Sequence, residues 1–361
     1  METFQRNTTQ QLKVRLQEPV RRIIVVSGPR QIGKTTAVGQ TLRGRPASSF
    51  SFLAVDAPET DGGASPDFNI GTATTRAFDN SAPHDAAWLI ANWQAARAAA
   101  LAWYLQPQPM PTQQPEQRLP FVLVFDEIQL IANWSSIVKG LWDQDRAHEL
   151  PMHVVVLGSA PLLMQSHLSE SLMGRFELLR MTHWSYSEMR DCFGFSLDQY
   201  VYFGGYPGPA PWVLQGNEHR WRDEVIHSLI EPNLVKDILA LARIEKPAVL
   251  RQLFQLGCTY SGQIVALTKM LTQLNDAGNT TTLTHYLQLL RAAGLLAGLE
   301  KYAAQAIRQR AAAPKLNVLN TAFVSVYSGK TFSQARSDHG FWGHLVESSI
   351  GAHLLNTAND G

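Results

Sequence analysis

The feature that most constrains the fold of this chain is a glycine-rich turn near its start. An apolar run at residues 22–27 (RIIVVS) leads directly into the sequence GPRQIGKTT at residues 28–36. Gly28, followed after four residues by Gly-Lys-Thr at residues 33–35, has the spacing of a phosphate-binding P-loop. A predicted strand precedes this motif and a predicted helix follows it, as the site requires. We therefore interpret the turn as a nucleotide site and not as a chance cluster of glycines.

The residue types in this motif suit a polyphosphate. The two glycines let the backbone bend so that N–H groups face an anion, and a helix predicted over residues 34–43 directs its positive end toward the same anion. Lys34 supplies a positive charge at the β- and γ-phosphates, and the Thr35 hydroxyl can ligate Mg²⁺. The predicted nucleotide-binding residues are Gly28, Pro29, Arg30, Gln31, Ile32, Gly33, Lys34, Thr35 and Thr36.

A second part of the site is predicted much further along the chain. Residues 119–125 (LPFVLVF) end in five consecutive apolar residues, and Asp126 and Glu127 follow them. Such a run is typical of a strand buried on both faces, so both carboxylates are expected at its C-terminal end. Beside a P-loop, Asp126 is predicted to hold Mg²⁺ through water and Glu127 to orient and deprotonate the attacking water. A pair of solvated acids at a strand end is the alternative.

Further segments complete a predicted α/β core. Three more strands are expected, because apolar and β-branched residues alternate there with turn-forming clusters, at residues 49–56 (SFSFLAVD), 152–157 (MHVVVL) and 176–181 (FELLRM). Residues 85–105 carry apolar side chains at helical spacing. Residues 57–85 and 106–115 are rich in turn-forming residues and are predicted connectors. The pattern predicts a parallel five-stranded sheet with helices beside it.

Composition excludes several other classes of protein. The chain has 31 basic and 30 acidic residues, so its net charge of +1 is no global signature of nucleic-acid or membrane binding. No apolar run approaches the ~20 residues that cross a bilayer, and no secretory leader is recognised, so we predict a cytoplasmic protein. Cys192 and Cys258 lack the spacing of metal ligands and are predicted to be buried, reduced thiols.

Several short motifs together resemble the DEXX-box family of AAA-type ATPases, whose members carry a C-terminal domain of unknown function. The motifs are GPRQ at residues 28–31, VFDEIQ at 124–129 with NW at 133–134, LGS at 157–159, LMGR at 172–175 and FGGYP at 203–207. The resemblance covers nearly the whole chain from about residue 20. It implies the ASCE/AAA-type version of the P-loop NTPase fold and hydrolysis of ATP with Mg²⁺.

The resemblance also implies roles for two residues outside the P-loop and the Asp-Glu pair. In such ATPases a polar residue at the tip of the strand beside the P-loop strand senses the γ-phosphate, and here it is Ser159; an ordinary strand-end turn is the alternative. An arginine before the fifth strand often reaches a neighbouring subunit's site, and here it is Arg175, which implies a homo-oligomer. A surface arginine, or one paired with Glu177, is the alternative. The predicted catalytic residues are Lys34, Asp126, Glu127, Ser159 and Arg175, and the predicted metal ligands are Thr35 and Asp126.

Two sites depart from the family pattern. Ala160 follows Ser159 where a second serine is usual, which weakens a sensor role shared between adjacent hydroxyls. Longer relatives continue past a Gly-x-x-x-Glu helix, here Gly343 to Glu347, into a nuclease-like segment. A nuclease site is therefore predicted to be incomplete. Glu347 is expected to be either a single residue of that pattern without the rest of the nuclease site, or a salt-bridge residue.

The residues after the core predict a second, smaller module. Residues 200–211 form a Gly-Pro turn cluster that we interpret as a hinge to a helical lid. Residues 261–294 read as helix, turn and helix, ending at Gly294. Two strands are then expected at residues 295–302 and 315–320, flanking a basic loop with Arg308, Arg310 and Lys315.

With the family resemblance, this pattern predicts a winged helix. DNA contact by the helix at residues 280–291 and by the wing is one use of such a module. Its use for packing or protein interaction is slightly favoured, because the helix face presents Arg291 and His285 as its cationic groups.

We predict four parts of the chain: an ATPase core at residues 1–190, a lid and hinge at 191–245, a winged-helix-like domain at 246–325 and an incomplete nuclease-like segment at 326–361. The predicted function is Mg²⁺-dependent ATP hydrolysis that moves the lid and winged helix. The alternative is a nucleotide-switched DNA- or protein-binding module with slow or incidental hydrolysis. A GTPase is disfavoured because a guanine-binding motif is lacking, and a small-molecule kinase because Glu127 suits activation of water.

Overall fold

The structure is a computed structural model, and it describes residues 4–56, 84–106, 119–159, 172–238, 244–275, 278–301 and 313–358. The described residues form two compact units. The first unit holds the chain up to Met181 apart from residues 28–32. The second unit holds these five residues and the chain from Thr182 onwards.

A parallel five-stranded sheet is the centre of the first unit, with strand order β2-β3-β4-β1-β5. The strands are β1 (Ile23–Ser27), β2 (Phe50–Ala54), β3 (Phe121–Asp126), β4 (Met152–Gly158) and β5 (Phe176–Arg180). Every residue of β1, β3 and β4 is buried, as expected for continuous apolar runs in a sheet covered on both faces. The predicted five-stranded parallel sheet is confirmed.

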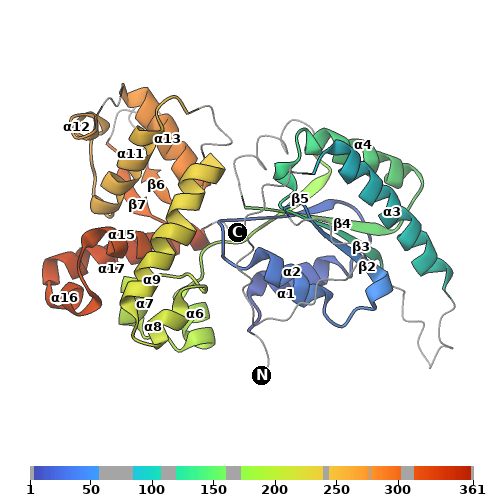
Figure 1. Cartoon of the computed structure of the whole chain (residues 1–361), viewed down its shortest axis with the longest axis horizontal. Coiled ribbons are helices and arrows are strands. Elements are labelled where there is room, and N and C mark those ends of the chain that lie inside the picture. The colour runs from blue at the N-terminus through green and yellow to red at the C-terminus, as the bar shows by residue number, and fades with distance from the viewer. Residues whose placement is uncertain are drawn as a thin grey trace. The chain divides into compact units, whose positions relative to one another are not determined.

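Helices cover both faces of this sheet (Figure 1). They are α1 (Asn7–Arg15), α2 (Lys34–Leu42), α3 (Ala86–Leu105) and α4 (Trp134–Ala147), with 3-10 turns η1 (Ala47–Ser49) and η2 (Ile128–Leu130). Helices α1 and α2 lie on one face, and α3 and α4 pack together on the other (Figure 1). On the α3 and α4 face, Trp93, Phe125 and Trp134 are buried in one hydrophobic core. The helix predicted at residues 85–105 is confirmed.

The strand order brings together the residues that carry chemistry. Strand β4 lies between β1 and β3, with Ser27 of β1 opposite Gly158 of β4. Because all strands are parallel, the ends of β1, β3 and β4 meet at one edge of the sheet. In open α/β sheets, ligands bind outside this carboxyl edge.

The second unit is mostly helical. Its helices before the strands are α6 (Tyr186–Phe193), α7 (Leu197–Phe203), α8 (Ala210–Leu214), α9 (Glu218–Glu224), the π-helical η3 (Val225–Ile230) and η4 (Asn233–Ile238), α11 (Pro247–Thr259), α12 (Leu267–Leu271) and α13 (Thr280–Ala292). After the strands come α15 (Ala322–Ser328), α16 (Phe332–Ser337) and α17 (His339–Thr357).

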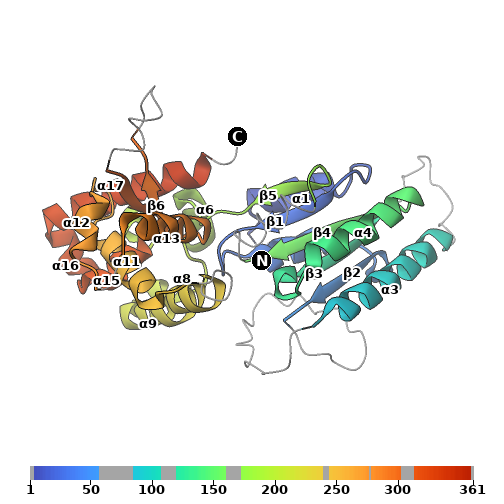
Figure 2. The same ribbon diagram turned by 90° about the horizontal axis from the view of Figure 1, so that it is seen from above.

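Two short strands in this unit agree with the sequence prediction. Strands β6 (Leu296–Leu299) and β7 (Lys315–Val318) pair antiparallel, and α13 packs on β6 (Figure 2). Gly294, with φ +76°, follows α13 in the left-handed conformation that ends a helix. The winged-helix interpretation itself stays a prediction.

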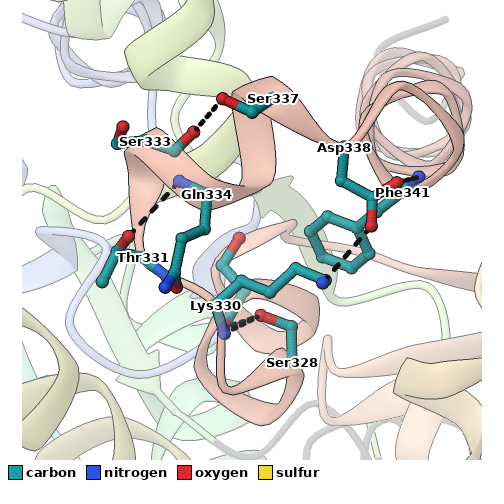
Figure 3. Close-up of polar contacts among 9 residues, drawn as sticks. Ser328, Lys330, Thr331, Ser333, Gln334, Ser337, Asp338 and Phe341 are labelled. Atoms are coloured by element: carbon teal, nitrogen blue, oxygen red, sulfur yellow. Dashed lines mark hydrogen bonds and ion pairs between the residues drawn. The ribbon is translucent and has the colours of Figure 1, made fainter.

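Side-chain caps fix the turns between the last helices. The Thr331 hydroxyl accepts from the Gln334 amide at the start of α16, and Asp338 accepts from the Phe341 amide at the start of α17 (Figure 3). Lys330 forms an ion pair with Asp338 at 3.3 Å. The caps by Thr331 and Asp338 satisfy helix N-terminal amides that otherwise lack a partner.

Some predicted segments lie outside the described residues. These are most of the two connectors, at residues 57–83 and 107–118, and the basic-loop residues Arg308 and Arg310. Within the described ranges, no helix is both long enough and apolar enough to cross a membrane.

Candidate nucleotide site

The end of β3 and the start of α2 meet in a direct hydrogen bond. The Thr35 hydroxyl donates to Oδ2 of Asp126 at 2.7 Å. Asp126 is the last residue of β3 and is 3% exposed, and Thr35 is the second residue of α2. Two of the predicted site residues, 91 positions apart in the chain, are thus brought together.

Burial gives the Asp126 carboxyl unusual electrostatics. Loss of solvent raises its pKa from 3.8 to about 6, and the nearby charge of Glu127 adds to this rise. The hydrogen bond from Thr35 and the positive charge of Lys34 act in the opposite direction and lower the pKa. A carboxyl in this setting gains from a cation placed beside it, because the cation offsets the cost of burying the negative charge.

The second oxygen of Asp126 fits a hard cation. Its Oδ1 is buried and has no hydrogen-bond partner among the described residues. A hydroxyl and a carboxylate oxygen are ligands that Mg²⁺ prefers, and Mg²⁺ keeps several waters and nucleotide oxygens in its shell. Within the described ranges there is no group of three His, Cys, Asp or Glu residues that could hold a metal on protein ligands alone. Thr35 and Asp126 therefore fit a Mg²⁺ that is shared with a bound nucleotide.

Glu127 is held by two neighbouring polar residues. The Ser159 hydroxyl donates to Oε2 of Glu127 at 2.8 Å, and the Gln129 amide nitrogen also donates to Oε2. Glu127 has φ 55°, a left-handed conformation that is uncommon outside glycine, and this residue leads into η2. The predicted sensor Ser159 thus lies on the Glu127 carboxylate. The sequence analysis named Gln129 only as part of a family motif. Its place two residues after Glu127 was the one sequence signal of a contact between them.

The P-loop backbone is left-handed at one of its two glycines, Gly33, and at Gln31. Gly33 has φ 92° and Gln31 has φ 56°, so left-handed residues alternate with other conformations through the turn. Such alternation turns successive N–H groups toward one side and makes a concave anion site. Lys34, the next residue, is 6% exposed and begins α2.

The first part of the P-loop is anchored in the second unit. Residues 28–32 cluster with that unit, and Gln31 donates from its side-chain amide to the Ser228 carbonyl at 3.2 Å. Trp184 donates from its indole to the Ile32 carbonyl at 2.9 Å. Gln31 was predicted to bind nucleotide, but its contact with Ser228 and the part played by Trp184 were not predicted.

Arg175 and Glu347 each form an ion pair with a residue outside the P-loop and the acidic strand end. Arg175 contacts both carboxylate oxygens of Asp143, at 2.7 and 3.1 Å, on an exposed surface. Its predicted alternative partner, Glu177, contacts Arg15 instead. Glu347 forms an ion pair with Lys315 at 2.6 Å, which agrees with its predicted salt-bridge role.

The sheet, the P-loop and the acidic strand end together define an α/β fold of the P-loop NTPase class. Residues 20–190 match the family model of an AAA domain, and residues 194–334 match the model of a domain of unknown function, DUF8612. The first match shows an AAA-type, P-loop ATPase-like domain. The finer DEXX-box assignment stays a prediction.

The chain is similar to one solved structure in fold and to two relatives in sequence. A Walker-type ATPase of Pyrococcus abyssi superposes with a TM-score of 0.52 at 12% identity, covering 89% of this chain and 94% of that one. At this identity the likeness shows the fold alone. Uncharacterised proteins of Mycobacterium tuberculosis and Mycobacterium bovis are each 25% identical over 205 residues, which is 56% of this chain. The match spans 43% of the length of each of these relatives.

Replacing Asp126 should stabilise the nucleotide-free protein at neutral pH. A carboxyl whose pKa rises from 3.8 to about 6 on folding adds stability that is complete below pH 3.8 and is lost as pH rises through about 6. At about 1.4 kcal/mol for each pKa unit, Asp126→Asn should raise the free energy of unfolding by up to about 3 kcal/mol at pH 8. The gain should shrink toward pH 5.

Urea unfolding in EDTA at several pH values measures this effect. Asp143→Asn, which removes an exposed carboxyl from the same unit, is the matched control. Equal stability of wild type and Asp126→Asn at every pH would contradict the prediction.

Proposed function

We propose that the chain is a Mg²⁺-dependent ATPase. The observation that carries this proposal is the hydrogen bond of 2.7 Å between the Thr35 hydroxyl of the P-loop and the buried Asp126 carboxylate. The bond joins the P-loop and the acidic strand end at the carboxyl edge of the sheet, with Asp126 Oδ1 left without a described partner. This pairing of a hydroxyl and a carboxylate is what phosphoryl-transfer enzymes of this class use to hold Mg²⁺.

In the proposed site the chain mainly positions and neutralises the triphosphate. The amides around Gly33 and the N-terminus of α2 would bind phosphate oxygens, and the Lys34 ammonium would contact the β- and γ-phosphates. Thr35 and Asp126 would hold Mg²⁺, which supplies charge neutralisation at the phosphate oxygens when bound. Phosphoryl transfer needs little covalent help, so these contacts supply most of the catalysis.

Glu127 is proposed to activate the attacking water. Its carboxylate would accept a proton from that water, which requires a fixed orientation of Oε1 and Oε2. The Ser159 hydroxyl and the Gln129 amide both donate to Oε2, so they support an arrangement in which Oε1 faces the water. Ser159 would then respond to the γ-phosphate through the same carboxylate.

The second unit is proposed to be the part that hydrolysis moves. Its strand pair and the helices α12 and α13 support a winged-helix module, and DNA is one partner that such a module binds. Slow hydrolysis that switches a DNA- or protein-binding module is the alternative form of this function. A cytoplasmic location is part of the proposal.

Release of phosphate from MgATP tests the proposed function. We expect the purified chain to release phosphate from ATP with Mg²⁺ and to release none with EDTA. Duplex DNA added at two salt concentrations shows whether the partner is DNA, because phosphate contacts make binding fall steeply with salt. A wild-type chain that neither binds MgATP nor hydrolyses it would overturn the proposal.

Arg175 is proposed to act in the site of a neighbouring copy. Because this role needs association and exchange of the Asp143 partner, we expect the specific activity to rise with protein concentration. Arg175→Ala should remove the rise, whereas Arg190→Ala, another exposed arginine with a carboxylate partner, should retain it. A constant specific activity across a dilution series of wild type would rule out action between copies.

A further inference from the structure

The indole of Trp184 holds one peptide of the P-loop. Trp184 is 8% exposed, and its Nε1 donates to the carbonyl of Ile32 at 2.9 Å in a buried hydrogen bond. Ile32 is itself fully buried and directly precedes Gly33. The contact therefore acts on the peptide that enters the Gly-Lys-Thr part of the motif.

Because a peptide bond is planar, the contact with the Ile32 carbonyl also fixes the direction of the Gly33 N–H, which can bind an anion. In a trans peptide the C=O of one residue and the N–H of the next point in opposite directions. When the indole holds the Ile32 carbonyl on one side, the N–H of Gly33 must face the other side. Gly33 has φ 92°, and a glycine populates positive and negative φ about equally, so the contact with the indole favours one orientation of this amide.

Trp184 is itself held by its neighbours. Its amide donates to the Gly205 carbonyl at 3.3 Å, and its carbonyl accepts from the Tyr200 hydroxyl at 3.0 Å. A Cβ at Gly205 would lie 2.1 Å from that carbonyl oxygen, so a larger residue there would displace Trp184. In the turn at residues 203–207, position 205 therefore requires a glycine for a structural reason.

A second contact fixes the other end of the same P-loop segment. A Cβ at Gly294 would lie 2.4 Å from Cγ of Pro29, so the ring of Pro29 packs directly on this glycine. The Gly294 carbonyl in turn lies 2.8 Å from Nε2 of His183, the residue before Trp184. Trp184 therefore contacts Ile32 directly, and His183 contacts Gly294, on which Pro29 packs.

We propose that Trp184 is a positioning residue for the phosphate cradle, acting through its indole hydrogen bond to keep the Gly33 N–H aimed at a bound polyphosphate. This inference rests on the proposed function, because the ligand is the phosphate chain of that site. The proposal adds Trp184 to the site. This residue is 152 positions after Ile32 and lies outside the P-loop and the acidic strand end.

Substitution of the indole tests this role. Trp184→Phe removes the N–H donor, and Trp103→Phe is the matched control, because Trp103 also donates to a backbone carbonyl, that of Leu119 at 3.1 Å. The probes are MgADP and inorganic tripolyphosphate, with adenosine as the phosphate-free reference. We expect the Kd of both phosphate probes to rise about 3- to 10-fold in Trp184→Phe, as for one lost hydrogen bond, with no change for adenosine. Trp103→Phe should bind all three as wild type does.

A second variant tests the same role if Trp184→Phe does not fold. If Trp184→Phe does not fold, 3-benzothienylalanine at position 184 keeps the shape of the indole and replaces its N–H with sulfur. Its Kd for tripolyphosphate should rise by the same factor, and circular dichroism should match wild type.

The outcomes separate this inference from the proposed function. Binding of tripolyphosphate within twofold of wild type in either folded variant would overturn the positioning role and leave the ATPase proposal standing. An equal loss of affinity for adenosine would also overturn it, because that result indicates general disruption. A wild-type chain that binds neither phosphate probe would remove the proposed function itself.

Discussion

Glu127→Gln should bind MgATP about as tightly as wild type and hydrolyse it about 10²- to 10⁴-fold more slowly, the contribution expected of a general base. Glutamine keeps the length and shape of the side chain, and its amide oxygen can still accept from Ser159. It cannot take a proton from water. The two readouts should therefore separate, with Kd unchanged and kcat greatly reduced.

Single-turnover hydrolysis and equilibrium binding measure these two effects. Glu149→Gln is the matched control, because Glu149 is exposed and has φ 53°, close to the φ of 55° at Glu127. The control has the same substitution in the same backbone conformation and should retain wild-type turnover. Hydrolysis by Glu127→Gln at the wild-type rate would remove Glu127 from the proposed role.

Lys34→Ala should lower both affinity and turnover. Loss of a charge-assisted contact to phosphate is expected to weaken binding of MgATP about 10- to 100-fold, and loss of one donor to the transition state to lower kcat about 10²- to 10³-fold. The effect should be larger for ATP than for ADP, because the ammonium is proposed to contact the γ-phosphate as well as the β-phosphate.

Lys139→Ala serves as the control for this substitution. Lys139 lies on α4 in the same unit, outside the residues that carry the site. Titration calorimetry with ATP and ADP, followed by phosphate release at saturating ATP, gives the two parameters separately. Unchanged affinity for both nucleotides in Lys34→Ala would contradict the proposed P-loop contact.

The place of Glu127 in the chain is predictable from the sequence, whereas the contacts of its side chain are not. Asp126 and Glu127 could be placed at a strand end because the five consecutive apolar residues before them are typical of a strand covered on both faces. The direction of the Glu127 side chain could not be predicted. That direction depends on the left-handed backbone at Glu127 and on two donors, Ser159 directly after β4 and Gln129 in η2.

The ion-pair partner of Arg175 is a second feature that the sequence did not predict. Its place just before β5 was predicted correctly, since the strand itself was recognisable from residues 176–180. Its partner is Asp143 of α4, where Glu177 had been the predicted alternative. A partner on another helix depends on how α4 packs against the sheet, and local sequence carries no record of that packing.

The sequence by itself determined the elements and the chemistry they carry. Buried strands, the P-loop turn and the helix at residues 86–105 depend on neighbours within a few positions, so spacing and apolar periodicity predict them. The tertiary structure decided which distant groups meet. The strand order β2-β3-β4-β1-β5 brings Asp126 to Thr35, and the path of the chain after β5 brings Trp184 to Ile32. These contacts join residues 91 and 152 positions apart in the chain. Contacts between residues so far apart depend on packing and chain topology, which no local sequence pattern encodes.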